Sequence, residues 1–305
     1  MIPNEFKDKR LVLFGAGRVA RLMFARFPQL KVIAFADNDP AKHETFVGEV
    51  PVVHPEALLS LEYDLVVIST GWWESITAQL HSLGVEVDKI MLPPKNMLAI
   101  NNGDKPFSHA ATKALAVEAM QHVADFAIRY DIPIMLDFGT LLGAIRDGEL
   151  IPWDDDIDFS INDYAFPLFT ARLAELKAVL PQRDDWNLEM TVLKSEGVIT
   201  GVSISYSNAV GHDAIVPFEM GFMCRVFEDG QSVTKGSGPA FIAPEVHFRD
   251  IGTTSFLGKQ FGTPYDVSGY LSFVYGDWKT PKQDVTLADY PMQESAYVET
   301  SRTVV

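Results

Sequence analysis

Cysteine is nearly absent, because the 305-residue sequence contains only Cys224. A single thiol cannot form a disulfide within the chain, so a disulfide-stabilised fold is excluded and a reducing compartment is favoured. Cys224 lies in the run GFMCRVF, which is typical of a buried strand. We therefore expect no catalytic role for this thiol.

Long hydrophobic runs are also missing. Apolar stretches such as LVLFG and LVVIST have the length of a strand, whereas a helix that spans a bilayer needs about 20 apolar residues. The opening segment MIPNEFKDKR carries charges where a secretory signal peptide would have its apolar region. These absences predict a cytoplasmic protein without a membrane span.

Positive charge is scarce, with 25 Lys and Arg against 41 Asp and Glu and a formal net charge of −16. General binders of nucleic acid or anionic membranes need a basic surface, so the composition disfavours both classes. A phosphorylated ligand would need a local cation or a metal ion. Hydrophobic residues make up 47% of the chain, which is typical of a globular protein, and its length allows two domains.

Residues 1–95 alternate apolar strands with amphipathic helices, a pattern that predicts a small Rossmann-like parallel sheet covered on both faces. A linker is expected at 96–107, where Asn, Gly and Pro are frequent. Four strands are expected, at 10–17, 31–39, 64–71 and 88–94, with helices at 18–28 and 73–84.

A glycine-rich turn follows the first of these strands. Gly15 and Gly17 open a helix, and Asp37 ends the next strand, as in the dinucleotide-binding fingerprint with Ala in its third position. Four strands would lack the second mononucleotide half, which leaves a nicotinamide without a pocket. The turn therefore indicates either nucleotide or sugar-nucleotide binding or a structural role, with NAD-dependent oxidation as the weaker alternative.

Three blocks of this region resemble the small N-terminal domains of bacterial sugar O-acyltransferases and polysaccharide-modifying enzymes. They are G-A-G at 15–17, D-N-D-P at 37–40 and G-x-x-P-V at 48–52. The resemblance implies a domain that binds a nucleotide-sugar or docks partners.

Residues 108–305 mix helices and strands in a different order, which predicts an α/β or α+β domain. Ser108 is expected to cap a long helix over 109–130. A strand at 133–139, a short helix at 140–148 and a strand at 155–161 follow, then a β-rich stretch. The final residues, 294–305, are expected to fray.

Aspartates crowd the strand at 155–161. Asp154, Asp156 and Asp158 alternate as D-x-D-x-D, so they would share one face at a spacing of ~7 Å, with Asp155 and Ile157 on the other face. Such carboxylates repel one another, and a hard divalent cation such as Mg²⁺ would relieve the repulsion. An acidic surface turn is the alternative, but the apolar neighbours favour the cation.

Other residues near this strand suit a phosphate. Gly139 and Thr140 stand at a strand end and open a helix, so their backbone N–H groups could hold a phosphate. Gly-Thr at a helix start followed by D-x-D on the next strand is the layout of the nucleotidyltransferase fold. Arg146 could fork a phosphate, and Lys259 is either a second phosphate contact or a solvated turn lysine.

The pattern G-T-L-L-G-x-x-R followed by I-P-W-D-x-D-h-D, at 139–146 and 151–158, closely resembles the LicD family. That family includes phosphocholine transferases of bacterial surface glycans and the fukutin-related proteins. A second family-like block at 270–281 keeps Tyr-Leu, Tyr-Gly, Trp and Pro, with one residue fewer before the Trp. The resemblance covers residues 110–283, so the expected fold is a Rossmann-like domain followed by a nucleotidyltransferase-like α+β domain.

The resemblance implies transfer of a phospho-substituent, such as phosphocholine or an alditol phosphate, from a CDP-linked donor to a sugar hydroxyl of a surface glycan or its precursor. Mg²⁺ or Mn²⁺ would assist. By position Asp156 and Asp158 would bind the metal, with Asp154 as a further ligand or a base. An additional carboxylate would come from a later strand, as Asp213 or Glu219.

Two other functions remain open from the sequence. One is a nucleotidyltransferase that moves a nucleoside monophosphate, and the other is a non-catalytic scaffold that binds nucleotide-sugars. The sequence names neither the transferred group, nor the acceptor, nor the oligomeric state.

Overall fold

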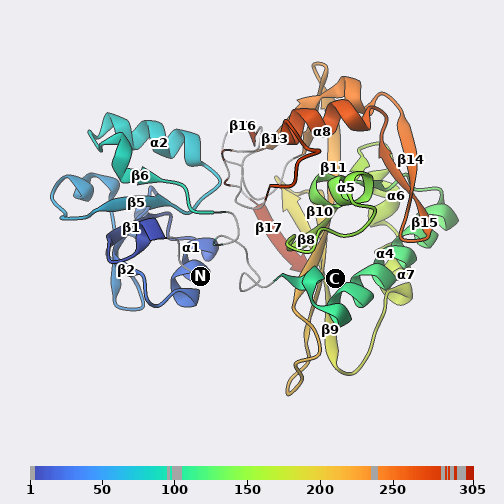
Figure 1. Ribbon diagram of the computed structural model, residues 1–305, viewed down its shortest axis with the longest axis horizontal. Coiled ribbons are helices and arrows are strands. Elements are labelled where there is room, and N and C mark those ends of the chain that lie inside the picture. The colour runs from blue at the N-terminus through green and yellow to red at the C-terminus, as the bar shows by residue number, and fades with distance from the viewer. Residues whose placement is uncertain are drawn as a thin grey trace. The chain divides into compact units, whose positions relative to one another are not determined.

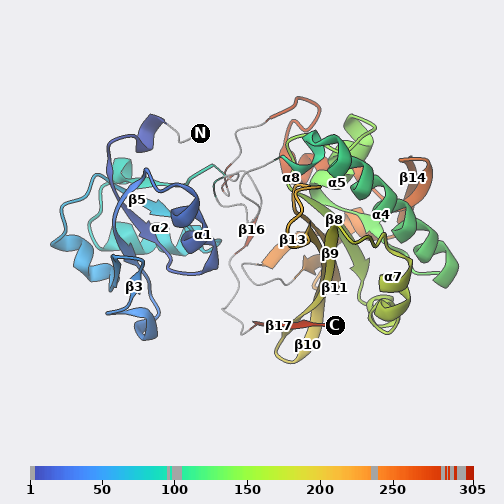
Figure 2. The same cartoon turned by 90° about the horizontal axis from the view of Figure 1, so that it is seen from below.

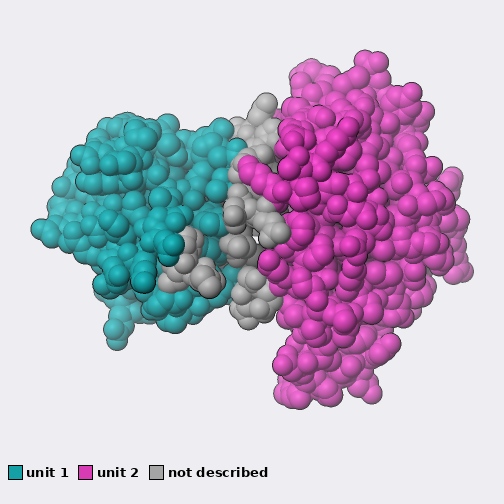
Figure 3. All heavy atoms as spheres, in the orientation of Figure 1, with its two compact units in different colours: residues 1–103, 284–290 teal, residues 104–283, 291–305 magenta. Residues whose placement is uncertain are grey.

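The computed structural model describes residues 4–94, 97, 105–234, 240–282, 286, 288, 292–293 and 300–305. The chain divides into two compact units, which Figure 3 colours separately. Unit 1 is Met1–Gly103 with Asp284–Tyr290, and unit 2 is Asp104–Gln283 with Pro291–Val305. Most of the predicted linker, 96–107, lies outside the described residues.

Unit 1 contains a six-stranded sheet with the order β3-β4-β2-β1-β5-β6. All neighbours are parallel except β3, which pairs antiparallel with β4. Leu11 and Leu13 pack on the side of α1, while Val12 and Phe14 pack on the side of α2, so helices cover both faces as predicted. The elements are β1 (Arg10–Phe14), α1 (Arg18–Arg26), β2 (Lys31–Ala36), β3 (Phe46–Val47), β4 (Val50–Val53), β5 (Leu65–Ile68), α2 (Trp73–Ser82) and β6 (Ile90–Met91).

The predicted number of four strands in this unit is wrong, because β3 and β4 were missed. Both are short, and β4 contains Pro51, which lacks the N–H that a strand donates to its neighbour. Val52 and Val53 nevertheless pair with β2. The parallel part of the sheet therefore extends further beyond β2 than the sequence indicated.

Unit 2 is built on one large mixed sheet, whose main path is β14-β15-β7-β8-β11-β10-β9-β17 (Figure 1). The pairs β8–β11 and β7–β15 are parallel, and the others on this path are antiparallel. The strands are β7 (Met135–Leu136), β8 (Asp156–Asn162), β9 (Trp186–Ser195), β10 (Val198–Asn208), β11 (Phe218–Glu228), β12 (Gln231–Thr234), β13 (Ala240–Pro244), β14 (Ile251–Phe256), β15 (Lys259–Pro264), β16 (Met292–Gln293) and β17 (Thr300–Val304).

Helices cover the central strands of unit 2. The longest of them, α4, lies beside α7 in both ribbon views (Figure 2). Under them, Phe159 of β8 stacks on Phe222 of β11 at 4.8 Å, and Phe222 stacks on Phe169 of α6 at 5.0 Å. This apolar face is the core of the unit, so polar groups on the same strands face the other way. The helices are α4 (Ala110–Tyr130), α5 (Phe138–Arg146), α6 (Phe166–Thr170), α7 (Leu173–Val179) and α8 (Val267–Tyr275).

The expected cap of α4 is wrong by one residue. His109 caps the helix, because its ring nitrogen Nδ1 accepts the N–H of Thr112 at 3.4 Å. The Ser108 hydroxyl instead donates to the carbonyl of Pro152 at 2.6 Å, a contact that no local pattern could reveal.

The expectation of a frayed C-terminus is wrong for residues 300–304. They form β17, which pairs antiparallel with β9 and covers its edge. Lys177 adds a hydrogen bond from its Nζ to the carbonyl of Val305 at 2.7 Å. The remainder of the predicted tail, 294–299, lies outside the described residues.

Candidate functional site

The carboxylates of the D-x-D motif lie on the polar face of two central strands. Asp156 and Asp158 point to the same face of β8, because residues two apart in a strand share a face. On the parallel strand β11 their register partners are Glu219 and Gly221. Figure 1 shows α5 and α8 in this part of the unit. Glu219 is therefore brought beside Asp156, whereas Asp213 lies exposed outside β11.

Asp154 precedes β8 instead of belonging to it, since the strand begins at Asp156. Asp154, Asp155 and Asp156 each offer a carboxylate oxygen, and these oxygens lie within 4.8 Å of one another. The expectation that Asp155 faces away from its neighbours is wrong, because β8 begins only at Asp156 and the strand alternation does not reach Asp155. Carboxylates this close repel one another, and a bound divalent cation would turn that repulsion into attraction.

Gly139 makes room for one of these carboxylates. A Cβ atom at this position would lie 2.1 Å from Oδ2 and 3.0 Å from Cγ of Asp154. No side chain fits there unless Asp154 moves away. The glycine of the Gly-Thr pair is thus in direct contact with the acidic cluster.

Thr140 connects α5 to the acidic strand. Its hydroxyl oxygen accepts the backbone N–H of Asp158 at 2.9 Å, and the residue is 2% exposed. The hydroxyl therefore has a structural partner. The backbone amides of Gly139 and Thr140 lie in the first helical turn, where a helix supplies no acceptor, so they can donate to a ligand.

A buried ionic network lies next to this turn, and sequence reasoning missed it. Arg225 of β11 donates from Nη2 to Oδ2 of Asp137, and Tyr270 of α8 donates its hydroxyl to Oδ1 of Asp137 at 2.5 Å. The same Oδ1 accepts the N–H of Phe138 at 2.9 Å. Asp137, Arg225 and Tyr270 are each at most 1% exposed.

Tyr270 is the neutral donor of this network. Burial, and next the carboxylate of Asp137, raise the pKa of the Tyr270 hydroxyl well above its usual value, so the hydroxyl stays protonated and donates. Arg225 also donates to Oγ of Ser232 at 2.8 Å and lies 4.0 Å from the ring centre of Phe248. An arginine inside the apolar run GFMCRVF was the available signal, because a buried charge needs a partner.

Arg146 lies away from the start of α5. It is at the last residue of the helix, about 10 Å along the axis from Gly139. Its guanidinium forks the carboxylate of Asp147, with distances of 2.8 Å from Nε and 2.7 Å from Nη2. The side chain is only 8% exposed. The guanidinium group that was expected to bind a phosphate is thus paired with the neighbouring Asp147.

The structure does not bring Lys259 to the acidic cluster. Lys259 begins β15, which runs parallel to β7 with Gly262 opposite Met135, so it lies at the end of the sheet remote from Asp137. There it forms an ion pair with both carboxylate oxygens of Asp125, at 2.7 and 2.8 Å. A long-range ion pair of this kind has no local signature in the sequence.

Cys224 is a buried residue of β11, in agreement with its interpretation from the sequence. Burial raises the pKa of its thiol to about 11. The thiol is therefore neutral near pH 7, which is consistent with the absence of a catalytic role.

In unit 1 the glycine-rich turn is closed by Asp37. The carboxylate accepts the N–H groups of Ala16 at 2.7 Å and Asp39 at 2.9 Å, and Lys42 donates to it at 3.1 Å. Burial raises the pKa of Asp37, but these donors outweigh it and hold the pKa below its usual value. A Cβ on Gly17 would meet no described atom within 4 Å, so the turn is open on that side.

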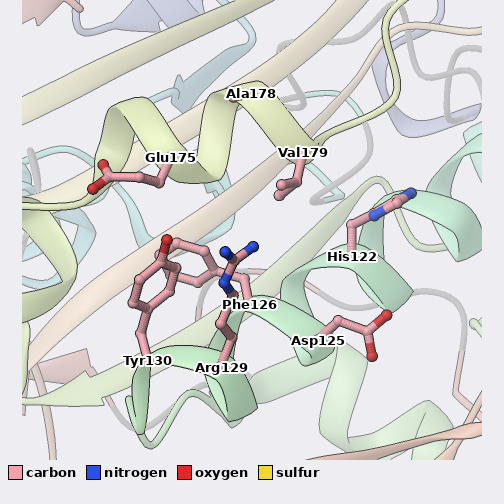
Figure 4. Close-up of a pocket in the computed structure, with 8 residues that line it drawn as sticks. All are labelled: His122, Asp125, Phe126, Arg129, Tyr130, Glu175, Ala178 and Val179. Carbon is pink, nitrogen blue, oxygen red and sulfur yellow. The ribbon is translucent and has the colours of Figure 1, made fainter.

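A hollow of about 310 Å³ lies between α4 and α7 and contains none of the predicted site residues (Figure 4). Figure 4 shows Arg129 and Tyr130 of α4 beside each other, with Glu175 projecting from α7. The lining of this hollow combines acidic, basic and apolar side chains. The lining residues are His122, Asp125, Phe126, Arg129, Tyr130, Glu175, Ala178 and Val179.

Two families of known proteins match the chain. Residues 131–266 match the family described as LicD/FKTN/FKRP, nucleotidyltransferase domain, and residues 7–91 match the family described as C2185-like, N-terminal. The first match spans the Gly-Thr turn, the acidic cluster and Arg225. At a coarse level it supports a phosphotransferase-type activity on glycans. No curated protein matches the chain.

Some solved structures resemble the chain weakly. UDP-D-quinovosamine 4-dehydrogenase from Vibrio fischeri is 24% identical over 28% of this chain and 78% of its own, with a TM-score of 0.24. Scyllo-inositol dehydrogenase from Lactobacillus casei is 9% identical over 92% of each chain, with a TM-score of 0.25. Biliverdin reductase from Synechocystis sp. PCC 6803 is 13% identical over 92% of this chain and 94% of its own, with a TM-score of 0.26. Likeness at this level carries no inference about substrate or cofactor.

Among the helices in the described parts of the chain, none combines the length and the apolar character that crossing a membrane requires.

Proposed function

We propose that this chain, whose residues 131–266 form a LicD-type nucleotidyltransferase domain, transfers a phospho-substituent from a CDP-linked donor to a sugar hydroxyl. The acceptor would be a surface glycan or its precursor, and the transferred group phosphocholine or an alditol phosphate. The observation that carries the proposal is the cluster of carboxylate oxygens within 4.8 Å of one another beside the start of α5.

The residues present fit a hard divalent cation. Carboxylate oxygens are the ligands that Mg²⁺ and Mn²⁺ prefer, and the space above Gly139 lets Asp154 approach the other acids. Asp154 and Asp156 would hold the ion. Asp158 and Glu219, which lie on the same face of the sheet as Asp156, would be further ligands. When bound, the ion would neutralise charge on the donor phosphates and on the departing group.

The chain's own residues would position the donor. The amides of Gly139 and Thr140 can donate to phosphate oxygens, because the first turn of a helix leaves its N–H groups without acceptors. Asp154 would act as a ligand or take the proton of the attacking hydroxyl. The hydroxyl oxygen forms a bond to the distal phosphorus while the bond between that phosphorus and CMP breaks.

A donor screen tests this proposal. The protein is incubated with Mg²⁺, a set of CDP-alcohols and a sugar acceptor, and the release of CMP is measured. We expect CMP from at least one CDP-alcohol. Pyrophosphate from CTP or ATP, in place of CMP, would support the alternative of a nucleotidyltransferase that moves a nucleoside monophosphate.

A further inference from the structure

We infer that Arg225 and Tyr270, acting through Asp137, are positioning residues for the turn at 137–140 and for the carboxylates that contact it. None of the three is placed to touch substrate, since each is at most 1% exposed. The inference deepens the proposed function and rests on it. It also assigns a role to Tyr270 in the family-like block at 270–281. The metal site gives that residue no role.

The network is more than a device for stability. A buried ion pair usually stabilises a fold no better than apolar residues of the same size would, because both charges must be taken out of water. Arg225 and Asp137 have been taken out of water completely, and Tyr270 adds a third polar group. What such a network supplies is a defined geometry, since the carboxylate of Asp137 accepts from Arg225, Tyr270 and Phe138 at once.

The backbone beside Asp137 is strained. Phe138 has a φ of +41°, in the left-handed region that residues with a side chain rarely adopt. Strain of this kind persists only where the surroundings enforce it, and it is concentrated at functional sites. On one side the N–H of Phe138 is held by Asp137, and on the other its ring packs edge-on against Phe241 at 4.7 Å. The network therefore holds the turn at 137–140 in a strained conformation that the turn would not keep by itself.

The strained turn contacts the acidic cluster directly. Asp154 lies against the Cα of Gly139, and the hydroxyl of Thr140 accepts the N–H of Asp158. A shift of the turn would displace both aspartates together. Strand β11 and helix α8, which are far apart in the chain, thus act on the carboxylates through the side chain of Asp137.

The deletion of one hydroxyl tests this role. Tyr270→Phe removes the donor to Asp137 and leaves the ring and the Arg225 pair in place. Tyr206→Phe is the matched control, because Tyr206 is equally buried and its hydroxyl has no hydrogen-bond partner among the described residues. Hydrogen exchange of the amides at 137–143, the rise in melting temperature on adding Mn²⁺, and the kcat and KM for CMP release are measured for each protein.

We expect Tyr270→Phe to speed exchange at 137–143 about tenfold, since a hydrogen bond to a charged group is lost. Its Mn²⁺-induced rise in melting temperature should shrink, and kcat should fall about tenfold with KM changed less than about twofold. Tyr206→Phe should match the unsubstituted protein in every measurement. Arg225→Lys keeps the charge but cannot donate to Asp137 and Ser232 from two separate nitrogens. It should give the same pattern as Tyr270→Phe and serves if that variant does not fold.

Unchanged exchange at 137–143 in a folded Tyr270→Phe or Arg225→Lys variant would overturn the inference, as would full kcat with the Mn²⁺ effect retained. If the unsubstituted protein showed neither CMP release nor a response to Mn²⁺, the proposed function would fail instead. The exchange comparison would then still decide whether the network holds the turn.

Discussion

At the level of single residues, the two glycines of the motif G-T-L-L-G, Gly139 and Gly143, have different structural roles. A Cβ on Gly139 would meet the flexible end of the Asp154 side chain, whereas a Cβ on Gly143 would lie 2.6 Å from the backbone carbonyl of Glu149. A side chain can swing away at little cost, but backbone cannot. One position therefore serves the carboxylates and the other serves the packing of α5.

We accordingly expect Gly139→Ala to lower CMP release about tenfold or more while its melting temperature changes by less than about 2 °C. Gly143→Ala should instead destabilise the protein by about 2 kcal/mol, measured by denaturant unfolding. Equal loss of stability in both variants would contradict the division of roles between these glycines.

A second residue-level prediction concerns the metal. Asp156→Asn should abolish turnover and remove the Mn²⁺-induced stabilisation, since a ligand charge is lost. Without metal the variant should be at least as stable as the unsubstituted protein, because repulsion within the cluster is relieved. Asp229→Asn makes the same charge change at an exposed turn and should behave as the unsubstituted protein. Full activity of Asp156→Asn would refute the metal site.

The pKa of Asp37 gives a prediction with a defined sign. Its folded-state pKa lies below the unfolded value, so its contribution to stability is complete above pH ~4 and is lost as pH falls through the folded pKa. Asp37→Asn should cost unit 1 about 2 kcal/mol at pH 7, and the difference should vanish in strong acid. Unfolding monitored at several pH values would check this.

At the level of elements, β17 protects an edge of the large sheet. Unpaired strand edges invite association with other chains, and β17 covers β9 over Thr191 to Ser195. A protein that ends before Thr300 should melt at a lower temperature and aggregate faster than the full chain. Light scattering during a thermal ramp would detect this, and unchanged aggregation would show that β9 needs no cover.

At the level of the whole molecule, the two units raise the question of whether unit 1 takes part in chemistry. If it only docks, a shortened protein that begins at Lys105 should release CMP on a soluble acceptor at the rate of the full chain. If it binds a nucleotide-sugar, calorimetry on the full chain should detect a second ligand, and Gly17→Trp should abolish that binding by blocking close phosphate approach. Loss of CMP release in the shortened protein would contradict a docking role.

Local features of the sequence were sufficient for the main elements and for the similarity of residues 131–266 to the LicD family. Apolar runs of strand length, amphipathic helices and the spacing from Gly139 to Asp158 depend on residues close together in the chain, where backbone propensity and side-chain periodicity act. They placed β1, β2, β5, β8, β9 and β10 and the helices α1, α2, α4 and α5, whereas α6, α7 and α8 were not predicted. They also predicted that Asp156 and Asp158 share a face.

Tertiary structure alone decided which distant groups meet. Asp137 follows β7 and caps α5, whereas Arg225 and Tyr270 belong to β11 and α8, and only the register of the sheet and the packing of α8 bring the three together. Register likewise put Glu219 beside Asp156, and packing paired Lys259 with Asp125. These contacts depend on how strands and helices assemble, and residues near in sequence carry no information about that assembly.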